Sequence, residues 1–345
     1  MQSIETTPLH AAAPQTATLP DTIRPETTLP AADVRSHPLL AAIGHTPLIE
    51  LTRVGDLPGG VRLLAKAEFM NPGGSIKDRA AAEMVADGID RGLLTVPSPG
   101  QAPAEVPTII DATSGNTGIA FAMIGASLGI PVTLVMPENT SPERKATMRH
   151  LGATVIDTVP AEDGSDGAFE MVREIVAANP GRYFYPDQYD NPANTRAHEW
   201  GTGAEIWQQS GGTVTHFVAS MGTSGTLMGT SRRLKRENSS VRSIAVQPDS
   251  PLHGIEGTKH MASTIRPSIL DDSIIDEVVV VSTARAYETT RRLALREGLF
   301  CGISSGANTA AALDVARRAE PGSVIVTVLP DTGSRYLSDH FWEAR

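Results

Sequence analysis

Apolar runs typical of buried strands alternate with helical patterns along most of this chain. The strand-like runs are continuous and lie at residues 63–67, 108–112, 131–136, 154–156, 215–219, 243–246, 278–281 and 324–329. Helical patterns lie at residues 80–86, 118–128, 141–151, 167–178, 227–236 and 284–298. Strands that are apolar throughout are buried on both faces, as in a parallel sheet covered by helices on both sides. The sequence therefore predicts an α/β fold with open, twisted, mostly parallel sheets and helices on both faces.

Chain length and the composition of the first segment bear on domain organisation. At 345 residues the chain is long for one compact core, so we expect two lobes. The first 36 residues are rich in Thr, Pro and Ala and have no apolar periodicity. They lack the basic start and apolar middle of a secretory signal, so we interpret residues 1–36 as a disordered N-terminal arm.

Charge, cysteine and histidine content exclude several classes of function. A net charge of −10 argues against nucleic acid as the main partner. The single cysteine, Cys301, excludes an internal disulfide and a multi-cysteine metal site, and it suits a reducing, cytoplasmic compartment. The sequence has no run of about 18 apolar residues, so we expect no membrane partner. The histidines show no paired spacing, so no metal is predicted.

The segment between an apolar run and an alanine-rich helical pattern contains the first candidate reactive residue. Residues 71–79 contain Pro72 and two glycines, which end the preceding strand, and Ser75 fits the N-cap of the next helix. Lys77 then lies in the first helical turn, where the helix dipole destabilises an ammonium group. A lysine whose neutral amine is accessible can attack a carbonyl to form a Schiff base. The alternative for a single lysine of this kind is a solvated surface side chain.

Three further loops contain residue types that suit ligand binding. Open α/β sheets bind ligands beyond the carboxyl ends of their strands. Residues 113–118 offer hydroxyls, an amide and backbone N–H groups at a helix start, which suits a carboxylate. Residues 222–226 combine two glycines with hydroxyls and no lysine, which indicates a cradle for a phosphate that is bound and not transferred. Residues 302–307 supply a serine hydroxyl that can meet a ring nitrogen. Each of the three is also compatible with an ordinary capped turn.

The four signals together fit one cofactor. Pyridoxal 5′-phosphate needs a Schiff-base lysine, a receptor for the substrate carboxylate, a phosphate cradle and a partner for its ring nitrogen. We therefore predict a site for pyridoxal 5′-phosphate.

The same segments resemble the fold-type II pyridoxal-phosphate enzymes, in the cysteine synthase and cystathionine β-synthase group. The resemblance covers about residues 38 to 340 and follows the order of the group's motifs. The matching residues are 44–48, 71–79, 113–118, 188, 191–194, 222–226 and 302–307. The resemblance implies a two-domain, tryptophan synthase β-like fold and a homodimer. The smaller N-terminal domain would span 81–187, and the larger domain would combine 37–80 with 188–345.

The resemblance also implies a role for each candidate site residue. Lys77 would hold the cofactor as an internal aldimine and act as the catalytic base. The other cofactor-binding residues would be Asn116 at the phenolic oxygen, Ser304 at the pyridine nitrogen, and Gly222, Thr223, Ser224, Gly225 and Thr226 at the phosphate. The substrate α-carboxylate would be held by Thr113, Ser114, Asn116, Thr117 and Gln188. A hydroxyl such as that of Ser304 does not keep a pyridine protonated, which favours β-elimination and β-replacement over transamination.

Two positions depart from the group's usual pattern. The phosphate loop often reads Gly-Thr-Gly-Gly-Thr in the family, and Ser224 takes the third place here. We expect a serine to be tolerated there if its backbone φ is negative. Lys259 lies where relatives close over the substrate, and it either binds a second phosphate or is solvated.

The activity that the resemblance implies is that of a cysteine synthase (O-acetylserine sulfhydrylase). Such an enzyme makes L-cysteine from O-acetylserine, or from O-phosphoserine, and sulfide through an aminoacrylate intermediate. Cystathionine β-synthase, which joins serine to homocysteine, and cysteine desulfhydrase remain alternatives within the family. A non-catalytic binding protein with the same fold is the alternative of another class. The expected partners are small molecules, and the sequence does not indicate whether a serine acetyltransferase binds.

Overall fold

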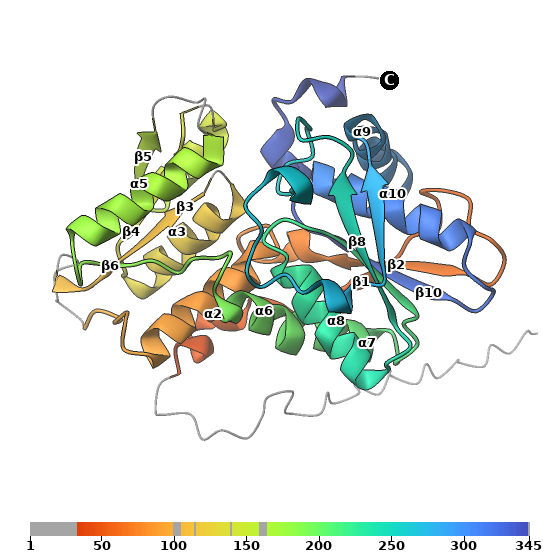
Figure 1. Cartoon of the computed structure of the whole chain (residues 1–345), viewed down its shortest axis with the longest axis horizontal. Coiled ribbons are helices and arrows are strands. Elements are labelled where there is room, and N and C mark those ends of the chain that lie inside the picture. Colours follow the sequence, from red (N-terminus) through yellow and green to blue (C-terminus); the bar gives the residue numbers. More distant parts are fainter. Residues whose placement is uncertain (1–32, 99–104, 114, 139, 159–163, 344–345) are drawn as a thin grey trace, which may run out of the picture.

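The computed structural model describes residues 33–98, 105–113, 115–138, 140–158 and 164–343, which contain two β-sheets (Figure 1). The strands of the larger sheet follow the order β1-β2-β10-β7-β8-β9, and those of the smaller sheet the order β5-β4-β3-β6. β1 runs antiparallel to β2, and the other neighbouring strands are parallel. The predicted α/β fold with open, mostly parallel sheets is confirmed.

The helices and strands follow the predicted alternation. The strands are β1 Leu48–Glu50, β2 Arg62–Ala67, β3 Thr108–Ala112, β4 Val132–Pro137, β5 Thr154–Thr158, β6 Tyr183–Phe184, β7 His216–Ser220, β8 Arg242–Pro248, β9 Glu277–Val281 and β10 Val324–Leu329. The helices are α1 Pro38–Ala41, α2 Lys77–Asp90, α3 Asn116–Leu128, α4 Pro142–His150, α5 Gly164–Ala178, α6 Pro192–Ala197, α7 Gly203–Gln209, α8 Gly225–Glu237, α9 Thr283–Arg292 and α10 Ile303–Arg317. None of the helices in the described ranges combines the length and the apolarity needed to cross a bilayer.

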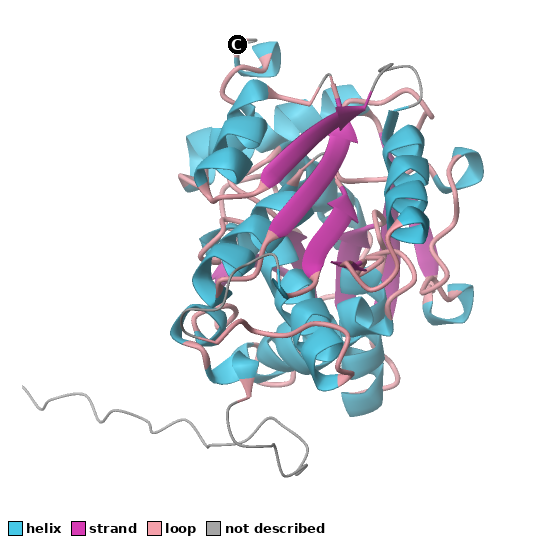
Figure 2. Ribbon diagram, turned by 90° about the vertical axis from the view of Figure 1, so that its left-hand side faces the viewer, coloured by secondary structure: helices cyan, strands magenta, loops and turns pink. Residues whose placement is uncertain are grey.

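The central strands of the smaller sheet, β3 and β4, are mostly apolar and are buried on both faces. Successive strand residues point to opposite faces. Ile109 and Leu134 therefore pack into a cluster with α2, α3 and α4, whereas Ile110 and Val135 pack against α5 on the other side. This arrangement of helices outside the strands is visible in Figure 2.

The larger sheet follows the same rule. Leu63 and Val218 face a cluster that includes residues of α10, and Phe217 and Val326 face a cluster that includes residues of α8. Both faces of the central strands are therefore covered, as the continuous apolar runs predicted.

Helix α2 connects the two parts of the molecule. It begins at Lys77, and its residues Met84 and Val85 pack into the apolar cluster beside the smaller sheet. The domain boundary expected between residues 80 and 81 falls inside this helix. The domain limits stay a prediction.

The start of α2 lies close to where the sequence placed it. The N-cap residue is Ile76 and not the predicted Ser75, although the Ser75 hydroxyl still accepts a hydrogen bond from the Lys77 backbone N–H at 3.3 Å. Lys77 nevertheless lies in the first turn, as predicted. Ser141 occupies the predicted N-cap of α4, but its side chain makes no capping hydrogen bond.

The described chain begins with a segment that the sequence assigned to the N-terminal arm. Residues Val34–Ser36 form a 3-10 turn, and Arg35 pairs with Glu83 of α2 at 3.1 Å. Residues 1–32 of the predicted arm lie outside the described residues, as do residues 99–104.

Candidate active site

A cavity lies beyond the carboxyl ends of the central strands of the larger sheet. It is bounded by Ser220 at the end of β7 and by Pro330, which follows β10. The structure brings seven of the predicted site residues to its wall, namely Lys77, Asn116, Gly222, Thr223, Ser224, Thr226 and Ser304. These residues are far apart in the sequence, so the fold assembles the site.

The starts of four helices deliver these side chains. Lys77 is the first residue of α2, Asn116 the first of α3, Gly225 the first of α8 and Ser304 the second of α10. Helix N-termini carry partial positive charge and free backbone N–H groups, which favour anions and disfavour cations. The cavity therefore suits an anionic ligand, and Lys77 is the cationic group that this environment destabilises.

The amine of Lys77 is poised for nucleophilic chemistry. Burial lowers the pKa of Lys77, and the nearby Asp331 carboxylate opposes that effect. Within the described parts of the chain, the Lys77 Nζ has no hydrogen-bond or ion-pair partner. The side chain is only partly buried, so a molecule in the cavity can reach the amine.

The loop at residues 222–226 is shaped by close backbone contacts. A Cβ on Gly222 would lie 2.2 Å from the Gly257 carbonyl oxygen, and one on Gly225 would lie 2.0 Å from Asn194 Oδ1. Both positions therefore require glycine. Between them Ser224 has a φ of +69°, so the condition of a negative φ, under which a serine was expected to be tolerated, is not met. The left-handed conformation costs an L-residue about 1–2 kcal/mol.

Ser224 lines the cavity, so its hydroxyl is available to a bound ligand although it is almost inaccessible to water. Its side chain is 2% exposed, and its hydroxyl has no hydrogen-bond partner among the described residues. A buried hydroxyl without a partner costs free energy, which a ligand oxygen in the cavity would recover.

Asn116 is held by two residues that the sequence did not single out. Its side-chain amide donates to Asp331 at 2.8 Å, and the Arg335 guanidinium donates to its carbonyl oxygen and to the Gly73 carbonyl. Asp331 also accepts from the Tyr336 hydroxyl at 2.6 Å. Asp331 directly follows β10 and Pro330, so the rule that ligands bind beyond strand ends could have found it.

Of the residues predicted to hold a substrate carboxylate, Asn116 lines the cavity, whereas Thr113, Thr117 and Gln188 do not. Thr117 donates to Gln188 Oε1 at 2.8 Å, and Gln188 Nε2 donates to Asp111 at 3.1 Å. Thr113 is buried at the end of β3. Ser114 lies outside the described residues. Burial raises the pKa of Asp111 well above its usual range.

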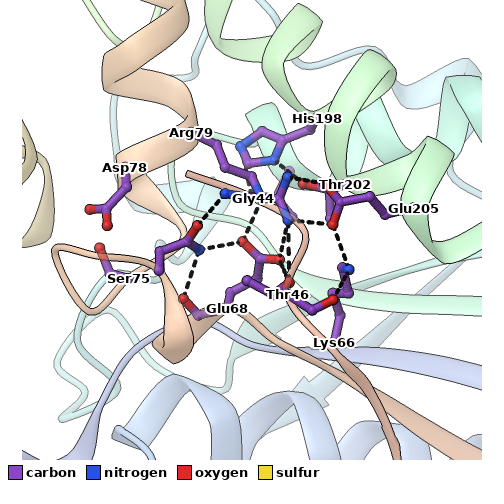
Figure 3. A network of polar contacts seen from close by, with 12 residues as sticks. Gly44, Thr46, Lys66, Glu68, Ser75, Asp78, Arg79, His198, Thr202 and Glu205 are labelled. Atoms are coloured by element: carbon purple, nitrogen blue, oxygen red, sulfur yellow. Dashed lines mark hydrogen bonds and ion pairs between the residues drawn. The ribbon is translucent and has the colours of Figure 1, made fainter. Parts of the chain in front are cut away.

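A buried network of charges fixes the first turns of α2 (Figure 3). Arg79 donates to Glu68 and to Glu205 at 2.7 Å, and Lys66 pairs with Glu205 at 2.6 Å. Burial alone would raise the pKa of Glu205, but Arg79 and Lys66 bring it down to about 2. Two cations and two carboxylates balance, so the network joins β2, α2 and α7 without an unpaired charge.

Two contacts link the loop after β8 to other parts of the chain. Glu256, which lines the cavity, pairs with Arg144 of α4 at 2.5 Å. The Lys259 ammonium lies 4.3 Å from the centre of the Tyr189 ring. The sequence left Lys259 as a phosphate ligand or a solvated side chain, and this cation–π contact was not foreseen.

The residues present fit pyridoxal 5′-phosphate. The Lys77 amine and the Ser224 hydroxyl line the cavity without a partner among the described residues. The loop beside them has glycine at positions 222 and 225, where a Cβ would clash with neighbouring atoms. A neutral hydroxyl, Ser304, also lines the cavity. Groups of three or more potential metal ligands are absent from the described residues.

Comparison with known proteins gives a consistent result. Residues 39–331 match the family model described as pyridoxal-phosphate dependent enzyme. The chain is 48% identical over 306 residues to a cysteine synthase of Aquifex aeolicus, which covers 87% of this chain and 90% of that protein. The crystal structure of cysteine synthase from Entamoeba histolytica matches with a TM-score of 0.82 and 35% identity, covering 93% of this chain and 95% of that one. An O-acetylserine dependent cystathionine β-synthase from Helicobacter pylori matches with a TM-score of 0.80 and 36% identity, covering 88% and 98%.

Proposed function

Because this chain belongs to the family of pyridoxal-phosphate dependent enzymes, we propose that it is a cysteine synthase that converts O-acetylserine and sulfide into L-cysteine and acetate. Its cofactor is pyridoxal 5′-phosphate. The observation that carries the proposal is the position of Lys77, whose amine shares one cavity with residues 222–226. The similarity to cysteine synthases over most of the chain supports the same activity.

Lys77 performs the proton transfers. When bound, pyridoxal 5′-phosphate supplies an electrophilic aldehyde and an electron-withdrawing ring that acidifies the α-proton of an amino acid. Lys77 Nζ takes this proton as general base, the Cβ–O bond breaks to release acetate, sulfide forms a bond to Cβ, and Lys77 returns a proton to Cα. Burial supports this role because it lowers the pKa of Lys77 and makes the neutral amine accessible.

The remaining cavity residues hold and orient the cofactor. Thr223, Ser224, Thr226 and the backbone N–H groups of their loop bind the phosphate. Asn116 would meet the phenolic oxygen, and its contacts with Asp331 and Arg335 fix its side-chain amide in one orientation.

Ser304 would meet the pyridine nitrogen of the bound cofactor with a hydroxyl, which would favour loss of a β-substituent over transamination. Its place in the cavity wall supports this role.

Thr113, Ser114, Asn116, Thr117 and Gln188 bind the substrate α-carboxylate. The hydrogen bond between Thr117 and Gln188 supports their joint action because it links two of these side chains, and Thr117 directly follows Asn116. The Gln188 amide also donates to Asp111, and this second hydrogen bond fixes the orientation of the Gln188 side chain.

A donor and acceptor screen tests the proposed activity. Purified holoenzyme is mixed with sulfide and with O-acetylserine, O-phosphoserine, serine or cysteine in turn, and products are identified by mass. Cysteine formed from O-acetylserine or O-phosphoserine and sulfide is expected. Turnover of cysteine to sulfide alone would favour a desulfhydrase, and lack of any turnover in yellow protein would favour a binding protein.

A cystathionine synthase activity is the second candidate. It is favoured by the likeness to the Helicobacter pylori protein, whose name specifies O-acetylserine as the donor. Replacing sulfide by homocysteine in the same screen separates the two activities, because cystathionine has a larger mass than cysteine.

We also propose that the enzyme is a cytoplasmic homodimer with a smaller domain at 81–187. The buried, single Cys301 and the family resemblance support this proposal. Light scattering of the purified protein and fractionation of the source cells test the assembly and the compartment.

A further inference from the structure

The segment that runs from α6 into the following π-helical turn lies against the start of α8. α6 covers Pro192–Ala197, and the π turn covers His198–Thr202. Close contact is possible because Gly229 of α8 has no side chain, and a Cβ there would lie 2.2 Å from the Thr195 carbonyl oxygen. The approach brings Asn194 and His198 to the rear of the phosphate cradle at residues 222–226.

Asn194 donates to one cradle hydroxyl from this side. Its side-chain Nδ2 lies 3.0 Å from Thr223 Oγ1 and also donates to the Gln188 carbonyl at 2.7 Å. Asn194 is 1% exposed. Since the Thr223 oxygen acts as acceptor in this bond, the single hydroxyl proton of Thr223 is left for another partner.

His198 contacts the other cradle threonine. Its Nε2 lies 3.3 Å from Thr226 Oγ1, and its Nδ1 lies 2.9 Å from Thr202 Oγ1 (Figure 3 shows His198 and Thr202). The ring is 1% exposed. Burial, with Arg79 and Lys77 nearby, holds the pKa of His198 well below its usual range, so the ring is neutral.

A neutral imidazole carries one proton, and its location decides what Thr226 can do. With the proton on Nδ1, the ring accepts at Nε2 and consumes the Thr226 hydroxyl proton. With the proton on Nε2, the ring donates to Thr226 Oγ1 and Thr202 donates to Nδ1. Only the second arrangement leaves the Thr226 proton available to an anion in the cradle.

We propose that Asn194 and His198 are positioning residues that donate to the Thr223 and Thr226 hydroxyls, so that both hydroxyls donate to a phosphate. This inference rests on the proposed binding of pyridoxal 5′-phosphate. It gives the resemblance motif at residues 191–194 a function that the sequence did not assign. It also specifies the Nε2–H tautomer for His198.

The first test uses two substitutions of His198 in the full-length protein freed of cofactor. The side-chain amide of glutamine in His198→Gln keeps an N–H donor at the position of Nε2. The shorter amide of asparagine in His198→Asn reaches only the position of Nδ1, so the donor to Thr226 is lost. The dissociation constants for pyridoxal 5′-phosphate and for pyridoxal, which has no phosphate, are measured by equilibrium dialysis. His216→Asn is the matched control, because His216 also contacts a threonine hydroxyl, Thr215 Oγ1 at 2.8 Å, but lies on β7 away from the cavity wall.

His198→Asn should weaken the binding of pyridoxal 5′-phosphate about tenfold and leave the binding of pyridoxal unchanged. Thr226 would then lose its hydrogen bond to the charged phosphate, and the loss of one such bond is of this size. His198→Gln and His216→Asn should stay near wild type. Asn194→Asp replaces a donor by an acceptor and should also weaken only the phosphorylated ligand. Equal weakening of both ligands would show a merely structural role and overturn the inference.

The second test needs no variant. ¹⁵N NMR of the histidine-labelled holoenzyme reports which ring nitrogen of His198 carries the proton. A proton on Nε2 supports the inference, and a proton on Nδ1 overturns it. Wild-type protein that binds pyridoxal but gains nothing from its phosphate also overturns it, whereas failure to bind either ligand would first overturn the proposed function.

Discussion

The side-chain amide of Asn116 donates a hydrogen bond of 2.8 Å to the carboxylate of Asp331, although 215 positions separate the two residues in the sequence. The bond joins the first residue of α3 to the segment after β10 and places a buried carboxylate near Lys77. Asp331 therefore influences two residues of the proposed mechanism.

Asp331→Asn should make the Lys77 amine neutral at lower pH. The negative charge of Asp331 raises the pKa of Lys77 against the effect of burial, so removing that charge lets the pKa fall further. The rate at which cofactor-free protein captures pyridoxal 5′-phosphate, measured against pH, should keep its high value to lower pH in the variant. Asp272→Asn, at the exposed surface, should leave the profile unchanged, and an unshifted profile in Asp331→Asn would contradict the assigned influence.

Lys77→Ala should abolish the covalent link between protein and cofactor. The Lys77 amine lines the cavity, so no other amine is expected to replace it. Reduction with borohydride followed by peptide mass analysis should find the cofactor on Lys77 in wild type and on no lysine in the variant. Cysteine formation should fall by at least about a hundredfold, the lower end of a general-base contribution. Lys235→Ala, which removes a surface ion pair with Asp276, is the control.

Ser224→Gly should stabilise the cofactor-free protein by about 1 kcal/mol. Glycine adopts the observed φ of +69° without the steric cost that serine has there. The midpoint of urea unfolding should therefore rise. Ser305→Gly, a buried serine inside α10, should lower it by about 0.5–1 kcal/mol because glycine weakens a helix. A lower midpoint for Ser224→Gly would mean that its backbone carries no such strain.

Glu205→Gln should destabilise the protein by about 3–5 kcal/mol, because it leaves Lys66 and Arg79 with too little negative charge in a buried site. The folded-state pKa of Glu205 is lowered to about 2 from the ordinary 4.5, so its contribution is complete above pH 4.5 and is lost as the pH falls to about 2. Unfolding by urea at several pH values measures both effects.

The control for this prediction is Glu50→Gln, which breaks an exposed pair with Arg62. It should cost less than about 1 kcal/mol. Equal losses for the two variants would show that the buried network contributes no more than a surface pair.

The sequence predicted well those elements whose burial leaves a local pattern. β3 and β10 were predicted to the residue, because strands that are mostly apolar stand out between loops. α10 was missed because nearly all of its residues from Ile303 to Ala316 are buried, so it lacks the polar face that makes helical periodicity visible. β6, with two residues, is too short to give a pattern.

The candidate site divides in the same way. Lys77 and the loop at 222–226 were found because glycines and hydroxyls at helix starts form a local signal. The contacts of Asn116 with Asp331 and Arg335, and of Thr226 with His198, join residues whose proximity only tertiary packing determines. The positive φ of Ser224 could not be predicted, because the backbone there follows the close contacts of Gly222 and Gly225 with other segments.

Helix α2 presents Lys77 to the cavity at one end and buries Met84 and Val85 beside the smaller sheet further along. A cut within this helix therefore does not separate the two sheets into fragments that each keep an intact apolar interior. A cut between residues 80 and 81 would leave the amine on a stub of four helical residues and strip the other fragment of its first turn. Recombination with a relative, or insertion of a foreign segment, should therefore be tolerated in the loops on either side of α2 and should disrupt the fold within it.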